Sequence, residues 1–181
     1  MEVTRSVLPE VLILKPRIFT DERGHFFEGH NQRDFETQTG VRAVFVQDNL
    51  SRSKKGVLRG LHYQNPQPQG KLVRVLAGEI FDVVVDIRRS SPTFGKTAAI
   101  RLSADNALMI WVPAGFAHGF LALSEFADVL YKTTDYYAPQ YEHCIVWNDP
   151  QLAIEWPLTA PPALSPKDRG GKQLKDAAVF I

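Results

Sequence analysis

The 181-residue chain has a single cysteine, Cys144, and almost no excess of charge, with 21 basic and 20 acidic residues. One cysteine excludes an internal disulfide and a cage of thiolates around a metal, and it fits a reducing compartment. A net charge of +1 creates no bulk field that would draw the chain to nucleic acid or to a membrane. An anionic ligand would therefore have to be bound by a local cluster of cations.

Long apolar runs are also missing. The first ten residues contain no apolar stretch of signal-peptide length, and no segment is long and apolar enough to cross a bilayer. We therefore expect a cytoplasmic protein without a signal peptide. Since no repeat, low-complexity segment or interdomain linker is visible, we expect residues 1–181 to form one domain with a substantial core.

A period of two dominates the hydrophobic pattern, and helical patterns are scarce. Glu79–Ile87 alternates so that Phe81, Val83 and Val85 share one apolar side, which is typical of a strand. Comparable short runs are Val11–Leu14, Ala43–Val46, Val57–Tyr63, Lys71–Ala77, Thr97–Leu102, Leu108–Val112, Phe120–Leu123, Ala127–Thr133 and Cys144–Trp147. Many short strands between Gly- and Pro-containing turns predict an all-β antiparallel sandwich or barrel.

Two short helices are predicted beside the strands. Asn31 can cap a helix that runs to about Gln38 and stops at Gly40. The run Ser165–Asp168 has a Ser cap, Pro at the first helical position and an acid at the third, which is typical of a helix start.

Side chains suited to proton transfer lie in Gly56–Gln64 and the strand after it. Arg59, His62 and Lys71 supply two cations and a base that works near neutral pH, a set suited to proton abstraction from an anionic substrate. A lone histidine would more often be a packing residue, but the two cations favour function here. Strict alternation puts Arg59 and His62 on opposite faces, so both reach one pocket only if the strand bulges, most simply at Gly60.

A second histidine motif is the turn Pro113–Gly119, which contains Pro-x-Gly-x-x-His ending at His118. It is similar to the second conserved motif of the cupin superfamily; an incidental hairpin histidine is the alternative. Cupins usually bind a metal through a His-x-His pair, a Glu and this later His, but here Gln64 stands two residues after His62. Because a metal site needs at least three convergent ligands, we expect a barrel without metal or other cofactor.

Nine ordered blocks extend this likeness over nearly the whole chain. They are Asp21–Gly24 with Phe26–Glu28, Phe45–Asn49, Gly56–Gln64, Gln69–Arg74, Gly78–Val83, Pro113–Phe120, Tyr131–Thr134, Trp147–Pro150 and Leu164–Asp168. In these blocks the chain resembles the dTDP-4-dehydrorhamnose 3,5-epimerase family. The resemblance implies a cupin-like jelly roll with a few short peripheral helices. It also implies inversion of C3 and C5 of a dTDP-linked 4-keto-6-deoxy sugar, through an enolate, in dTDP-L-rhamnose biosynthesis.

The resemblance further assigns roles to individual residues. It implies His62 as the base, Asp168 as its partner, Tyr131 as the acid and Lys71 as the cation at the enolate oxygen. The alternatives are a helix-capping role for Asp168 and a packing role for Tyr131. The implied substrate-binding residues are Arg23, Glu28, Gln47, Asp48, Asn49, Arg59, His118, Tyr137, Glu142 and Lys167, of which Arg23, Arg59 and Lys167 would contact the diphosphate.

The family resemblance also implies a homodimer in which subunits exchange strands, with the Arg23–Glu28 segment as the donor. Three other functions stay open. One is an epimerase that inverts only C3 or only C5, and another is a sugar-nucleotide ketoisomerase on the same barrel. The third is a cupin module that binds without catalysis.

Overall fold

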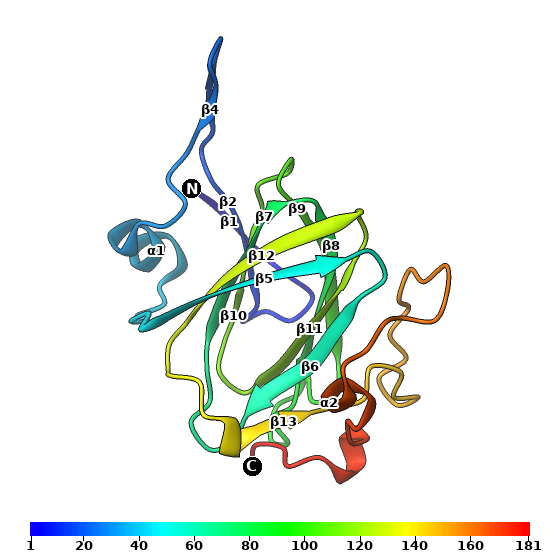
Figure 1. The fold of residues 1–181 in the computed structure, drawn as a ribbon. Coiled ribbons are helices and arrows are strands. Elements are labelled where there is room, and N and C mark those ends of the chain that lie inside the picture. The colour runs from blue at the N-terminus through cyan, green and yellow to red at the C-terminus, as the bar shows by residue number, and fades with distance from the viewer.

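The computed structural model describes residues 1–181 and confirms the predicted all-β fold (Figure 1). The strands are β1 (Glu2–Arg5), β2 (Leu12–Lys15), β3 (Phe19–Asp21), β4 (Gly24–Phe26), β5 (Gln47–Lys54), β6 (Leu58–Gln64), β7 (Lys71–Ala77), β8 (Glu79–Asp86), β9 (Thr97–Ser103), β10 (Met109–Val112), β11 (Phe116–Ala122), β12 (Phe126–Thr133) and β13 (Glu142–Cys144). The α-helices are α1 (Gln32–Thr39) and α2 (Pro166–Arg169), and the 3₁₀ turns are η1 (Pro139–Tyr141) and η2 (Leu174–Asp176). No helix is long and apolar enough to span a membrane.

Two antiparallel sheets form the barrel. One has the order β1-β2-β10-β7-β12-β5, and the other has the order β13-β6-β11-β8-β9. Strands far apart in the sequence are neighbours in both sheets, as in a jelly roll. The β3–β4 hairpin is a separate two-stranded sheet that projects away from the barrel (Figure 1).

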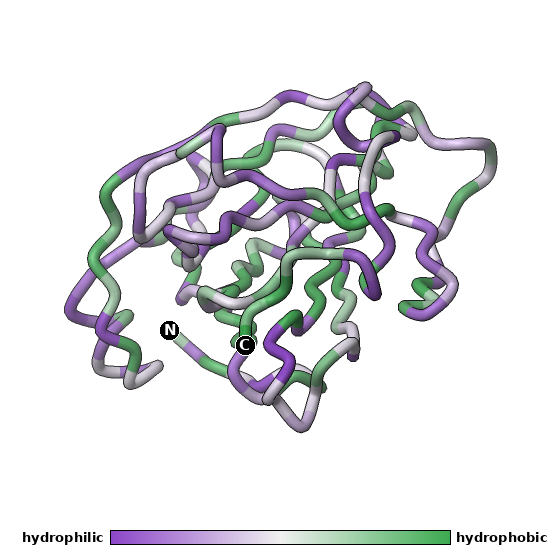
Figure 2. The backbone as a smooth tube through the Cα atoms, turned by 90° about the horizontal axis from the view of Figure 1, so that it is seen from below, coloured by the Kyte–Doolittle hydropathy of each residue, from purple (hydrophilic) through white to green (hydrophobic).

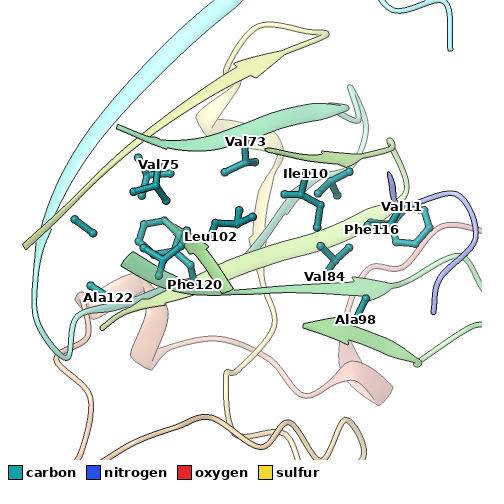
Figure 3. Packing of buried hydrophobic residues seen from close by; sticks show 14 of the residues in the cluster. Val11, Val73, Val75, Val84, Ala98, Leu102, Ile110, Phe116, Phe120 and Ala122 are labelled. Atoms are coloured by element: carbon teal, nitrogen blue, oxygen red, sulfur yellow. The ribbon is translucent and has the colours of Figure 1, made fainter. Parts of the chain in front are cut away.

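The interior between the sheets is apolar over most of its length. Val73 and Ile110 of one sheet pack with Val84, Leu102 and Phe116 of the other (Figure 3). Burying each such side chain stabilises the fold by about 1.5–3 kcal/mol. The alternation that produces this core is visible along the chain as changes between hydrophobic and hydrophilic residues (Figure 2).

The inward-facing series changes from apolar to polar toward one end of the barrel. On β7 and β12, Val75 and Val129 are paired neighbours in the core, and Tyr131 lies one step further, opposite Val73. The next pair in the same direction is Lys71 and Thr133. The apolar core therefore ends before the end of the barrel, and polar side chains line the interior beyond it.

Further apolar clusters cover the outer faces of both sheets. The C-terminal segment places Ile145, Leu152 and Leu174 against Val83 and Val85 of β8. The predicted apolar side of β8 is therefore confirmed, and its other side faces the barrel interior. On the other sheet, Phe35 of α1 belongs to a cluster with Leu12, Leu14, Leu72 and Trp111.

Both predicted helix starts are confirmed. The Asn31 side chain accepts a hydrogen bond from the Asp34 amide, and Gly40 ends α1 with a φ of 72°. Ser165 caps α2 in a reciprocal capping box with Asp168.

Two predicted strand ranges are wrong. Ala43–Val46 is not a strand, and the strand follows it as β5. The pattern misled because β5 carries its half-buried positions on polar residues such as Asn49 and Ser51. The predicted Cys144–Trp147 strand instead ends at Cys144 as part of β13.

The bulge predicted at Gly60 is confirmed. His62 pairs with His118, whereas Arg59 pairs with Phe120, so β6 has one more residue than β11 between the two pairs. Gly60 has a φ of +114°, and a Cβ added there would lie 2.7 Å from both the Gly119 Cα and the His118 carbonyl oxygen. Only glycine fits this close approach of two strands.

Gly60→Ala should lower the free energy of unfolding by roughly 2–5 kcal/mol, because backbone strain and a clash with β11 add together. Chemical denaturation would measure this loss. The control is Gly24→Ala, since Gly24 has a similar φ of +126° but no atom within 4 Å of the added Cβ. Equal losses in the two variants would show that strand contact does not restrict Gly60.

Candidate active site

A cavity of about 390 Å³ opens at the polar end of the barrel. Its lining comes from both sheets, from α2 with the residue before it, and from the loop residues Gln69 and Tyr137. Ten of the predicted site residues line it: Asn49, Arg59, His62, Lys71, His118, Tyr131, Tyr137, Glu142, Lys167 and Asp168. The structure thus brings together residues that are as far as 119 positions apart in the sequence, from Asn49 to Asp168.

His62 and Asp168 are in close contact in this cavity. The Nε2 atom of His62 lies 2.7 Å from Oδ1 of Asp168, whose side chain is only 4% exposed. The oxygen lies off the direction of an aligned ring N–H bond, so the two groups are in close polar contact without an ideal hydrogen bond.

Asp168 is held in place by more than its histidine. The Gly60 amide donates to Oδ1 at 3.1 Å, and the Ser165 hydroxyl donates to Oδ2 at 2.6 Å. Burial alone would raise the pKa of Asp168, but the contacts with His62, Ser165 and the Gly60 amide outweigh it and hold the pKa well below its usual range. Asp168 therefore both caps α2 and serves as a charged partner of His62.

Tyr131 and Lys71 come from the opposite sheet. Burial, reinforced by the nearby Glu142 charge, raises the pKa of Tyr131, so its phenol stays protonated. Burial lowers the pKa of Lys71 to about 8, which leaves the ammonium mostly protonated at neutral pH. A sugar ring bound between the sheets would have His62 of β6 on one side and Tyr131 of β12 on the other. The buried Lys71 lies on β7, in the same sheet as Tyr131.

His118 reaches the cavity with a buried partner that sequence reasoning missed. Its Nε2 atom lies 2.8 Å from Oδ2 of Asp82, a residue with no exposed surface. The other carboxylate oxygen of Asp82 has no hydrogen-bond partner. Burying a carboxylate costs free energy unless the carboxylate is paired. The presence of Asp82 in the largely apolar strand β8 could therefore have indicated a buried polar partner.

A polar cluster forms another part of the cavity wall. Glu142 accepts a hydrogen bond from the Tyr137 hydroxyl at 2.5 Å and forms an ion pair with Lys167. Burial would raise the pKa of Glu142, but Lys167 and Tyr137 lower it overall. Arg59 donates to the Ser53 hydroxyl at 2.9 Å and to the Arg52 carbonyl, which links β6 to β5.

Four predicted site residues do not line this cavity. Arg23 lies on the projecting hairpin in an ion pair with Asp21, and Glu28 lines a different cavity. Asp48 faces outward and pairs with Lys132. Gln47 does not line the cavity itself, but its side chain accepts a hydrogen bond from the backbone amide of Tyr137, which does.

Other polar residues line the cavity without having been predicted. They include Ser51, Gln64, Gln69 and Ser165. Ser51, Gln64 and Gln69 each lie two positions from a predicted site residue, in the same strand or just before it. Because alternate residues of a strand face the same side, this spacing could have predicted them. Ser165 was recognised only as a helix cap.

Comparison with known proteins identifies relatives along the whole chain. The sequence profile of the family described as dTDP-4-dehydrorhamnose 3,5-epimerase matches residues 5–176. A protein of that name from Pseudomonas aeruginosa is 60% identical over 180 residues, 99% of each chain. One from Salmonella typhimurium is 54% identical over 178 residues, 98% of this chain and 97% of the relative.

A solved structure agrees with the relationship. The dTDP-6-deoxy-D-glucose-3,5-epimerase of Legionella pneumophila, in complex with dTDP-4-keto-L-rhamnose, superimposes with a TM-score of 0.94 and is 53% identical. The alignment covers 96% of this chain and 93% of that one.

Asp168→Asn should lower the free energy of unfolding by roughly 1–3 kcal/mol at pH 7, because a buried charged partner is lost. A carboxyl whose pKa is lower in the folded state stabilises the fold above its unfolded pKa, near 4, and this contribution disappears as the pH falls through the folded value. The difference from the wild type should therefore begin to shrink below about pH 5 and continue to shrink below about pH 3 in denaturation experiments. Asp105→Asn, at an exposed turn, is the control. If the difference in unfolding free energy between the wild type and Asp168→Asn did not change with pH, the role of the charge would be contradicted.

Proposed function

Because the chain belongs to the dTDP-4-dehydrorhamnose 3,5-epimerase family, we propose that its cavity inverts C3 and C5 of a dTDP-linked 4-keto-6-deoxy sugar, with the roles below. The protein is an isomerase of dTDP-rhamnose biosynthesis. The observation that supports the roles most directly is the position of the His62–Asp168 pair and Tyr131 on opposite walls of one cavity.

The chemistry explains why opposite walls are needed. The C4 ketone acidifies the hydrogens at C3 and C5, and loss of either gives an enolate. In a gluco-configured chair these two hydrogens are both axial on the same face, so one base can remove each in turn. Returning a proton from the other face inverts the centre, which requires an acid across the ring.

His62 is the base in this proposal. It lines the cavity, and the Asp168 carboxylate stabilises the imidazolium that forms when the ring takes a proton. Such a positioned base contributes about 10²–10⁴-fold in rate. Asp168 touches no substrate in this proposal and acts as a positioning residue.

Tyr131 is the acid, and Lys71 stabilises the enolate oxygen. A buried phenol with a raised pKa holds its proton until an enolate carbon forms nearby. The Lys71 ammonium has no carboxylate within ion-pair distance, so it can interact with the oxygen where negative charge develops. His118, held by Asp82, completes the polar lining around the sugar.

Arg59 and Lys167 bind the diphosphate. Arg59 offers a planar fork of donors, and Lys167 offers a point charge. Lys167 would exchange Glu142 for a phosphate oxygen when substrate enters. Tyr137 and Asn49 line the same cavity and would contact the rest of the nucleotide sugar.

The remaining assignments concern assembly. We propose a homodimer in which the Arg23–Glu28 segment of each subunit, at the tip of the β3–β4 hairpin and just after it, reaches the other subunit's cavity, since neither Arg23 nor Glu28 lines the cavity of its own chain. Gln47 and Asp48 remain proposed binding residues on β5. We also propose that residues 1–181 act as one cupin-like domain, that the enzyme is cytoplasmic and that it needs no metal or cofactor.

Incubating the chelator-treated protein with dTDP-4-keto-6-deoxyglucose in D₂O tests the proposal. We expect deuterium at two carbons by mass spectrometry, and reduction to dTDP-rhamnose when a rhamnose-forming reductase is added. One deuteron would instead indicate a single-centre epimerase. No exchange, with dTDP still bound, would indicate a binding module or a ketoisomerase with another substrate.

Two variants should separate base from acid in the same assay. His62→Ala should lose exchange at both carbons, by about 10²–10⁴-fold, while dTDP binding survives. Tyr131→Phe should slow inversion more than proton wash-out, because the base remains. The exposed Tyr136→Phe is the control. Retained turnover without His62, or equal loss of wash-out and inversion without Tyr131, would overturn the respective role.

A further inference from the structure

Cys144 lies against the His62–Asp168 pair but has no part in the proposed mechanism. Strand β13 pairs with β6 so that Cys144 is directly opposite His62. A ring nitrogen of His62, the Cys144 sulfur and a carboxylate oxygen of Asp168 all lie within 4.8 Å of one another. Three kinds of donor atom from β6, β13 and α2 therefore converge at one point.

This donor set suits a thiophilic divalent cation. Thiolate, imidazole and carboxylate are the ligands of zinc in proteins, and zinc sites of three protein ligands leave a fourth position for water. A thiolate and a carboxylate would together balance the two positive charges of the ion. Since His62 lines the cavity, an ion could enter from there and keep its open position toward it.

The three ligands are held by separate elements. Asp168 is fixed by Ser165 and by the Gly60 amide, and the strand register fixes Cys144 relative to His62. One movement is required, because nitrogen and oxygen ligands of a tetrahedral zinc lie about 3.3 Å apart, whereas His62 and Asp168 are 2.7 Å apart. A small rotation of the partly exposed His62 ring would supply that difference.

Without an ion, Cys144 should not disturb the base. Burial raises the pKa of the Cys144 thiol to about 12, so it is a neutral neighbour of the pair. Metal coordination removes the proton from a bound thiol.

We propose that His62, Cys144 and Asp168 form an inhibitory site for a thiophilic divalent cation such as Zn²⁺, in which the ion occupies the base and its partner. The binding part of this inference stands on the geometry alone. The inhibition part rests on the proposed function of His62.

Binding would be measured with CoCl₂ added to the chelator-treated full chain. We expect one cobalt per chain and a thiolate-to-cobalt charge-transfer band, which Cys144→Ser should remove. His143→Gln, at the neighbouring position on β13, should keep the band and controls for general surface binding. No band in the wild type, or a band that survives in Cys144→Ser, would overturn the site.

Inhibition would be measured with ZnCl₂ in the deuterium-exchange assay. The wild type should lose exchange and recover it on chelation. Cys144→Ser should keep its basal exchange but need roughly 100-fold more zinc, since loss of even an outer-shell partner weakens metal binding about 10–100-fold. Cys144→Ala repeats the test with a residue that cannot coordinate. Equal zinc sensitivity in all three proteins would overturn the proposal.

The two measurements separate this inference from the proposed function. A cobalt band in a protein that shows no exchange in the absence of metal would support the site and contradict the enzyme. Metal-independent exchange without a cobalt band would support the enzyme and contradict the site.

Discussion

The carboxylate of Asp168 joins the C-terminal part of the chain to the barrel. It accepts hydrogen bonds from the Gly60 amide in β6 and from Ser165 at the start of α2, and it pairs with His62. Buried charge is tolerated only when such partners surround it. The bulge at Gly60 is part of the same arrangement, because it presents the backbone amide to Asp168 and turns Arg59 to the side of His62.

The two sheets give the site its two-sided character. The core packs Val73, Val84 and their neighbours tightly, which fixes the distance between the sheets along most of the barrel. Where the inward positions become polar, the same spacing leaves a cavity with different chemistry on its two walls. The stability of the apolar part therefore sets the geometry with which His62 and Tyr131 face each other across the cavity.

Much of this could be predicted from the sequence, for physical reasons that differ between elements. The alternation in β8 and the caps Asn31 and Ser165 are local signals, and they gave the strand and both helix starts correctly. Strand β5 was misplaced because its inward residues are polar, as its position beside the cavity requires. The partnership of Asp82 with His118 is a contact between strands, which no single segment reveals.

Glu142, which binds both Lys167 and the Tyr137 hydroxyl, affects which anions the cavity can select. In the empty cavity an internal carboxylate already neutralises this lysine, so an incoming anion must compete with it. A single weak anion gains little from that exchange, whereas a diphosphate that also reaches Arg59 gains several charge-assisted hydrogen bonds at once. Glu142 thus competes with incoming anions for Lys167, and this competition weakens the binding of small anions more than that of a diphosphate.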